Sequence, residues 1–269
     1  MHRSGTSALT RALPVVGVEL GDRLRPAFAG NNDTGFWEDL DINAVNIEIL
    51  GALGGDWDTP GPSSAAWLER QEVAPLRERA AQLLSSKAAS GELFGIKDPR
   101  LARLLAFWRP IFRQLELQAF YLLAVRNPMS VARSLAARDG FTEAKSYDLW
   151  MEHTLGALAG TRYEARLCVD YDELMLDPAR QVRRISRFLA RPVDESACQE
   201  YVARFLDPQL RHTRFFIGDL ENEPGIPSQV CKLYSLMRRA AIDDRSLAWN
   251  AIDTYLDEPA LDRSVSSPM

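Results

Sequence analysis

Residues 119–128 read Ala-Phe-Tyr-Leu-Leu-Ala-Val-Arg-Asn-Pro, and this stretch decides the fold class. Its apolar run, residues 119–125, is short and continuous, which predicts a strand buried on both faces. The residues that follow predict the start of a helix, because Asn127 can cap it and Pro128 can occupy its first position. A buried strand that leads directly into a helix is typical of a parallel sheet in an α/β protein.

Two other apolar runs, residues 93–96 and 167–169, are also followed by a polar turn and then by a helical pattern. Strands that alternate with helices predict an α/β three-layer sandwich, with helices on both faces of a central parallel sheet. We expect a single domain over residues 1–262 and a loose tail at 263–269. The clearest helical patterns cover residues 8–16, 42–50, 65–89, 182–189, 195–206, 229–241 and 247–256. We expect Pro14 to end the first of these early and Pro75 to kink the third.

Composition narrows the class of protein. The net charge of −5 and the pI near 5.4 argue against a nucleic-acid partner, which usually requires a basic surface. Three widely spaced cysteines without a CxxC or Cys/His cluster indicate reduced core residues and no metal site. The longest apolar stretches are too short to span a bilayer, and no signal-peptide pattern is visible. We therefore expect a cytoplasmic protein without a membrane span.

The segment His2-Arg3-Ser4-Gly5-Thr6-Ser7, followed by a helical pattern, suits a loop that wraps a phosphate. Gly5 allows backbone N–H groups to approach an anion, and the helix start adds partial positive charge. Arg3 supplies a full positive charge, while Ser4, Thr6 and Ser7 supply hydroxyl donors. The alternative is a helix cap with an unrelated arginine. A Walker A loop is excluded, because Thr6 stands where that motif has its lysine.

A basic residue followed by Ser-Gly-Thr-[Ser/Thr] resembles the 5′-phosphosulfate loop of sulfotransferases that use 3′-phosphoadenosine 5′-phosphosulfate (PAPS). The His-Arg-Ser-Gly-Thr-Ser variant is similar to bacterial members related to the carbohydrate-type and tyrosylprotein branches. A second motif supports this resemblance: Arg126-Asn127-Pro128 follows a strand, and Ser134 lies eight residues beyond Arg126. The resemblance implies a P-loop-containing sandwich in which Arg126 and Ser134 bind the 3′-phosphate of PAPS. An arginine at the carboxyl end of a strand faces the ligand crevice of an open sheet; the alternative for Arg126 alone is an ion-paired surface residue.

The same resemblance suggests the residues that activate the acceptor. Several carbohydrate and tyrosylprotein enzymes use a glutamate base, and Glu38 lies in the irregular stretch 28–63 where such relatives carry it. We expect aromatic neighbours to shield its carboxyl group from water; the alternative is a solvated loop acid. Arg3 joins Glu38 in the predicted catalytic set. Lys97, with Arg100, is expected to contact the sulfuryl group or an acidic acceptor, and the alternative is ion pairing with Asp98 and nearby acids.

The remaining basic candidates are weaker. His2, His153 and His212 are expected to be structural or on the surface rather than catalytic. Arg211 and Arg214 could grip the 3′-phosphate, although the basic glycine loop of cytosolic relatives is not recognisable around them. The predicted catalytic set is therefore Glu38, Arg3 and Lys97.

Two other functions stay open on the sequence. A P-loop kinase or NTPase would need a loop lysine, which is absent, and a Mg²⁺-binding acid, for which Asp170 is the one candidate. The other is a nucleotide-binding homologue without turnover. In α/β phosphate-binding folds a strand leads into the loop, and Met1 stands where that strand should end, so we expect the first strand to be missing from this chain. The expected acceptor is a small molecule or a glycan, no metal cofactor is expected, and the oligomeric state stays open.

Overall fold

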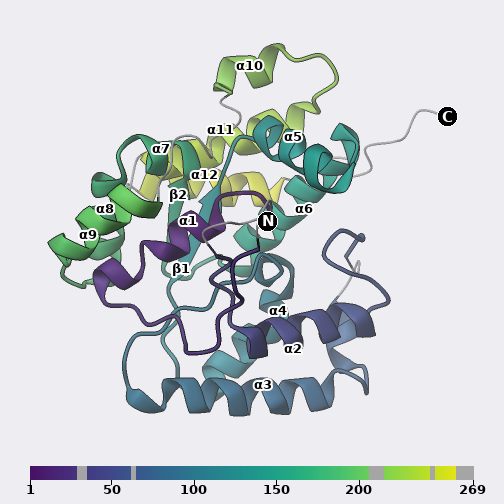
Figure 1. Cartoon of the computed structure of the whole chain (residues 1–269). Helices are drawn as coiled ribbons and strands as arrows, with labels where there is room; N and C mark the ends of the chain where they lie inside the picture. The colour runs from purple at the N-terminus through teal and green to yellow at the C-terminus, as the bar shows by residue number, and fades with distance from the viewer. Residues whose placement is uncertain (29–34, 62–64, 206–214, 243–245, 259–269) are drawn as a thin grey trace.

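The computed structural model describes residues 1–28, 35–61, 65–205, 215–242 and 246–258 (Figure 1). The helices of the N-terminal part are α1 (Thr6–Arg11), η1 (Pro14–Val16), α2 (Leu40–Ala52), η2 (Ala65–Glu69), α3 (Ala74–Lys87), η3 (Ala88–Ser90) and α4 (Leu101–Gln114). The chain continues with β1 (Tyr121–Val125), α5 (Pro128–Asp139), α6 (Glu143–Gly160), β2 (Arg166–Asp170), α7 (Tyr171–Leu176), α8 (Pro178–Leu189), α9 (Glu195–Phe205), α10 (Ile217–Asn222), α11 (Ser228–Ile242) and α12 (Ser246–Asp257).

The strands β1 and β2 pair in parallel, with Tyr121 opposite Arg166 and Val125 opposite Asp170. The strands predicted at residues 119–125 and 167–169 are both confirmed. Successive side chains of a strand point to opposite faces, and here each face is covered by helices. Leu123 and Cys168 join a core with α5, α6, α11 and α12, whereas Leu167 and Val169 join a second core with α1, η1, α8 and α9. The strand pair therefore lies between two helical layers, which fits an α/β fold.

The strand predicted at residues 93–96 is reduced to a single parallel bridge between Phe94 and Glu19. The Glu19 N–H donates to the Leu93 carbonyl at 3.0 Å, and the Gly95 N–H donates to the Glu19 carbonyl at 2.6 Å. A strand needs a partner along its whole length, and within the described residues Glu19 alone supplies one. The prediction of a full strand here is therefore wrong, although the backbone is held in an extended pairing.

A third core, formed by α2, α3 and α4, lies in the lower part of Figure 1. Its centre is the fully buried Trp108 of α4, whose indole N–H donates to Asn46 of α2 at 2.8 Å. The predicted helix over residues 42–50 is confirmed as α2. The predicted kinked helix over residues 65–89 is wrong: η2 ends at Glu69 and α3 begins at Ala74. Pro75 lies in the first turn of α3, where a proline loses no helical hydrogen bond.

Proline has a similar effect at the start of the chain. The predicted helix over residues 8–16 is divided into α1 and η1, and Pro14 begins the second piece, which agrees with the expectation that Pro14 ends the first helix early. The expected start signal of α5 is present, since Asn127 accepts a hydrogen bond from the Met129 N–H, and Asp177 caps the start of α8 in the same way by accepting one from the Arg180 N–H. Among the helices that the structure describes, none is long and apolar enough to cross a bilayer.

Candidate functional site

The N-terminal loop has an unusual backbone that matches its sequence. Gly5 is the residue before α1 and has a φ of 79°, in the left-handed region that favours glycine. A Cβ atom at Gly5 would lie 2.1 Å from Cδ2 of Tyr171. Arg3 also has a positive φ, of 63°. The loop is therefore pressed against the start of α7, and this position requires glycine for both its φ and its space.

The loop meets the carboxyl end of β1 and the first turns of α5. Arg3 donates from Nε to Oγ of Ser134 at 2.7 Å, and Arg126 donates from Nη1 to the carbonyl oxygen of Arg3 at 3.1 Å. The guanidinium of Arg126 also lies 4.4 Å from the ring centroid of Tyr171. We call Arg3, Arg126 and Ser134 the arginine–serine cluster. Arg3 is 123 residues from Arg126 and 131 from Ser134 along the chain, and the structure brings it into contact with both.

The charge of this cluster suits an anion. Burial, followed by repulsion from Arg138 and Arg126, lowers the pKa of Arg3, although a guanidinium stays protonated at neutral pH. Ser130, one turn before Ser134 on α5, is fully buried, and its Oγ has no hydrogen-bond partner among the described residues. A buried polar group without a partner is costly, but Ser130 has no exposed surface and so does not face a ligand in this conformation. The positive charge that suits an anion therefore comes from the two guanidinium groups.

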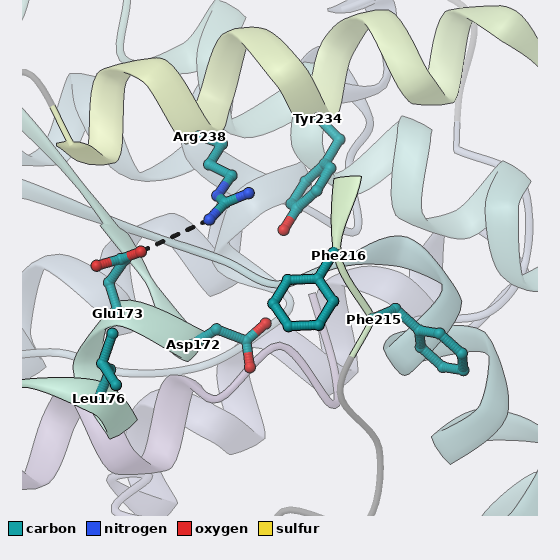
Figure 2. A pocket seen from close by; sticks show the side chains of 7 residues that line it. All are labelled: Asp172, Glu173, Leu176, Phe215, Phe216, Tyr234 and Arg238. Carbon is teal, nitrogen blue, oxygen red and sulfur yellow. Dashed lines mark ion pairs between the residues drawn. The ribbon is translucent and has the colours of Figure 1, made fainter. Parts of the chain in front are cut away.

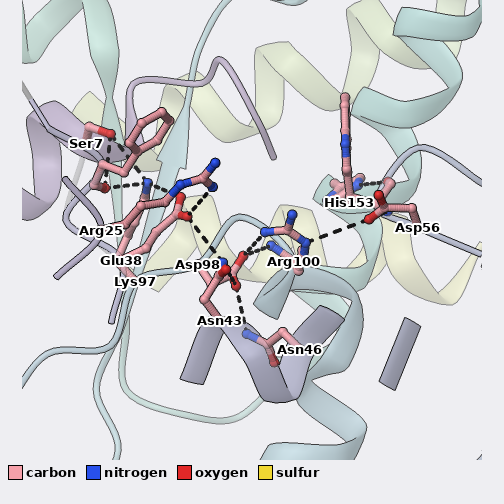
Figure 3. A network of polar contacts seen from close by, with 12 residues as sticks. Ser7, Arg25, Glu38, Asn43, Asn46, Asp56, Lys97, Asp98, Arg100 and His153 are labelled. Atoms are coloured by element: carbon pink, nitrogen blue, oxygen red, sulfur yellow. Dashed lines mark hydrogen bonds and ion pairs between the residues drawn. The ribbon is translucent and has the colours of Figure 1, made fainter. Parts of the chain in front are cut away.

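A second polar centre is built around Glu38, at the start of α2 (Figure 3). Lys97 donates from Nζ to Oε1 of Glu38 and to the carbonyl oxygen of Phe36, both at 2.8 Å. Lys97 also lies 3.4 Å from Oγ of Ser7 on α1. Burial lowers the pKa of Lys97, and the adjacent Glu38 carboxylate opposes this change. The structure therefore places Glu38, Lys97 and the end of the N-terminal loop together.

The other oxygen of Glu38 tests an expectation. Oε2 accepts hydrogen bonds from Asn43 at 3.3 Å and from Arg25 at 3.4 Å, and the residue is only 2% exposed. The carboxyl group is shielded from water as expected, so the alternative of a solvated loop acid is wrong. Trp37 lies against Arg11, whose guanidinium carbon is 5.0 Å from the indole centroid. The Glu38 carboxyl group is therefore in contact with two cationic side chains and one amide.

Arg100 has a different role from Lys97. It donates from its main-chain N and from Nη1 to Oδ1 of Asp98, at 2.9 and 3.2 Å. The Asp98 side chain has no exposed surface, and its other oxygen accepts from Asn43 and Asn46 at 2.9 and 3.0 Å. Both residues form the ion pairs of the alternative: Arg100 pairs with Asp98, and Lys97 pairs with Glu38.

Two of the three histidines lie in a packed region beside the loop. The His2 ring is 4.2 Å from the ring of Trp57, and Nε2 of the buried His153 is 3.1 Å from the Trp57 carbonyl oxygen. Desolvation lowers the pKa of both histidines well below the ordinary value. These contacts fit the expected structural role. His212, Arg211 and Arg214 lie outside the described residues.

A shallow pocket lies beyond the carboxyl end of β2, between α7 and α11 (Figure 2). Its side chains are Asp172, Glu173, Leu176, Phe215, Phe216, Tyr234 and Arg238. Arg238 forms an ion pair with Glu173 at 3.7 Å. None of the predicted catalytic or phosphate-binding residues lines it, so the pocket adds no group to the arginine–serine cluster or to the Glu38 centre.

Sequence reasoning missed three residues that touch the site: Tyr171, Asn43 and Arg25. Tyr171 lies just after the strand predicted at residues 167–169, but its contact with Gly5 gave no signal in the sequence. Asn43 and Arg25 carry no motif. Their contacts with Glu38 depend on how α2 packs and on the antiparallel bridge that joins Leu24 to Asp39.

Fold and site together describe an α/β protein with the arginine–serine cluster at the N-terminal loop and a buried ion pair between Glu38 and Lys97. Residues 117–227, about two fifths of the chain, match the family model of the sulfotransferase domain. This match supports a sulfotransferase family and, in general terms, the transfer of sulfuryl groups. The matched segment contains Arg126 and Ser134, whereas the loop, Glu38 and Lys97 precede it. Comparisons with curated proteins and with solved structures gave no match.

Proposed function

We propose that this protein is a sulfotransferase that moves a sulfuryl group from PAPS to a hydroxyl group of a small-molecule or glycan acceptor. The observation that carries the proposal is the arginine–serine cluster. Its members come from two motifs, one at the N-terminus and one after β1, and they touch one another through hydrogen bonds of 2.7 and 3.1 Å. We also propose that it is related to the bacterial carbohydrate-type and tyrosylprotein branches, because it has the loop His2-Arg3-Ser4-Gly5-Thr6-Ser7 and the candidate base Glu38.

The donor would be held at both of its charged ends. Arg3, Ser4, Gly5, Thr6 and Ser7 would hold the 5′-phosphosulfate, and Arg126 and Ser134 would hold the 3′-phosphate. PAPS itself supplies the activated sulfur–oxygen bond, so the residues need only bind, orient and handle the proton.

The Glu38 centre would serve the acceptor. Glu38 takes the proton from the attacking hydroxyl group, as a general base. Lys97, already in contact with Glu38 and close to Ser7, stabilises the negative charge that develops on the leaving oxygen, and Arg3 does so from the loop. Burial of both Glu38 and Lys97 strengthens these charge interactions by excluding water.

The decisive variant is Glu38→Gln, assayed by mass-spectrometric detection of PAPS consumption with a mixed library of acceptor hydroxyls. We expect turnover to fall by about 10²–10⁴-fold, the usual contribution of a general base. Binding of the product 3′-phosphoadenosine 5′-phosphate (PAP), measured by calorimetry, should stay close to the wild-type value. Glu48→Gln is the matched control, because Glu48 is an exposed residue of α2 that pairs with Arg79. Near-normal turnover of Glu38→Gln would exclude Glu38 as the base.

The two rival functions give different results in the same experiments. A kinase or NTPase would bind ATP with Mg²⁺ and ignore PAP. Asp170 is a poor metal ligand for that purpose, because it is buried and its Oδ1 accepts the N–H groups of Asp172 and Glu173 at the start of α7. A homologue without turnover would bind PAP and transfer sulfate to no acceptor of the library.

A further inference from the structure

Asn43 of α2 contacts two carboxylates with one amide group. Its Nδ2 donates to Oε2 of Glu38 at 3.3 Å and to Oδ2 of Asp98 at 2.9 Å. An amide nitrogen carries two hydrogens, so it can serve both acceptors at once. The orientation of the amide is also unambiguous, because its oxygen would be repelled by two carboxylates in the same place.

The Asp98 end of this bridge is rigid. Asp98 accepts four hydrogen bonds, from Asn43, from Asn46 and twice from Arg100. Asn46 is fixed in turn by the indole N–H of Trp108, which lies in the core of α2, α3 and α4. Each of these groups is buried, so few alternative partners exist for them. The amide of Asn43 is therefore held in place before it reaches Glu38.

The Glu38 end needs such a support. Glu38 follows Trp37, which has a φ of 58°, and it belongs to the segment before α2 instead of to the helix itself. Its Oε1 is held by Lys97 and its Oε2 by Asn43 and Arg25. The Arg25 side chain is 41% exposed and its bond is long, at 3.4 Å. Asn43 is thus the buried and anchored partner of Oε2.

We propose that Asn43 is a positioning residue, which transmits the rigidity of the α2–α4 core to the Glu38 carboxylate and so sets the direction in which that carboxylate receives a proton. This inference rests on the proposed function of Glu38 as the base. A carboxylate that lacks this support would rotate about its side-chain bonds, and small misplacements of a catalytic group lower the rate more than they change binding.

The chain offers a matched pair of variants. Asn43→Ala removes one bond to Asp98 and the bond to Glu38, whereas Asn46→Ala removes one bond to Asp98 and none to Glu38. Both residues lie on α2 and both are buried, so both variants lose stability. We expect Asn43→Ala to lower kcat by about 10–100-fold with the KM for PAPS unchanged, and Asn46→Ala to lower kcat by about threefold or less.

A readout that does not need turnover is a thermal double-variant cycle with Glu38→Ala. Because Asn43 and Glu38 touch, the loss of Tm in the double variant should fall short of the sum of the single losses by about 2–4 °C. The cycle of Asn46 with Glu38 should be additive within error. Asn43→Ser, which keeps one donor, should recover part of the lost kcat.

The outcomes separate this inference from the proposed function. Equal loss of kcat in the two asparagine variants, or additive Tm losses for Asn43 and Glu38, would overturn the positioning role while PAPS-dependent transfer stands. Absence of PAPS-dependent transfer and of PAP binding in the wild-type protein would overturn the proposed function. The Tm cycle would then still decide whether Asn43 supports Glu38.

Discussion

Substitution of Gly5 by alanine is the sharpest test of how the N-terminal loop is held. A Cβ atom built on Gly5 lies 2.1 Å from Cδ2 and 2.8 Å from Cγ of Tyr171. Cγ joins the ring to the stem of the side chain, so the ring cannot avoid the new methyl group by moving its far end alone. Because Gly5 also has a φ of 79°, the variant suffers both an overlap and backbone strain.

The magnitude follows from these two contributions. A non-glycine residue in the left-handed region costs about 1–2 kcal/mol. An overlap that displaces a packed side chain costs about 1–3 kcal/mol more. We therefore expect Gly5→Ala to lower the free energy of unfolding by about 2–5 kcal/mol. Part of this loss should be recovered in the double variant with Tyr171→Ala, where the overlap is gone and the strain persists.

Gly54 provides the matched control. Its φ is 80°, nearly that of Gly5, and a Cβ atom there would meet nothing within 4 Å. Gly54→Ala should therefore lose only about 1–2 kcal/mol. Chemical denaturation with urea, followed by tryptophan fluorescence, gives both values. Equal losses for the two variants would refute the argument that Tyr171 presses on the loop.

The same variant should also affect nucleotide binding. The Tyr171 ring lies 4.4 Å from the guanidinium of Arg126, so a displaced ring moves the residue proposed to hold the 3′-phosphate. We expect Gly5→Ala to weaken PAP binding in calorimetry by at least tenfold, which is about 1.4 kcal/mol. Gly54→Ala should bind PAP as the wild type does. Unchanged binding in Gly5→Ala would mean that the loop and Arg126 are independent.

Two further variants test other parts of the site. Arg126→Lys keeps the charge but loses the planar fork that reaches the Arg3 carbonyl, so PAP affinity should fall about tenfold or more while binding of adenosine 5′-monophosphate changes little, as calorimetry can show. Burial raises the pKa of Asp170 to about 6, so the folded state holds its proton more tightly than the unfolded state, and stability falls as pH rises from about 4 to 6. Asp170→Asn should flatten that part of the stability profile and add up to about 3 kcal/mol at pH 7, measured by urea denaturation at several pH values; an unchanged pH profile would contradict it.

The fold class could be predicted because its signals are local. The runs at residues 119–125 and 167–169 are continuous and apolar, which is what a strand covered by helices on both faces requires. The run at residues 93–96 has the same character, yet its partner is only Glu19, and nothing in a local pattern tells how long a distant partner segment is. Pro75 likewise lies in a helical pattern that continues on both sides, so its position at the start of α3 became visible only in three dimensions.

The candidate site also contains some residues that the sequence indicates and others that it does not. Arg3, Arg126 and Ser134 were predictable, because a motif or a spacing marks each of them and strand ends carry ligand-binding residues in this class of fold. Asn43 and Arg25 were not, because their role comes from contacts with Glu38 that depend on tertiary packing. Buried asparagines such as Asn43 and Asn46 have no periodicity or motif that distinguishes them from the other polar residues of α2.

The helix α1 links the two centres of the proposed site. Arg3, before the helix, contacts Ser134 and Arg126, whereas Ser7, in its first turn, contacts Lys97 and the carbonyl oxygen of Phe36. The cores that support the two centres differ, since α5 and Arg126 pack with the strand pair and Asn43 packs with α2, α3 and α4. Variants of the α2–α4 core should therefore change kcat without changing PAP affinity, while Gly5→Ala should change both, because the loop is the element that the two centres share.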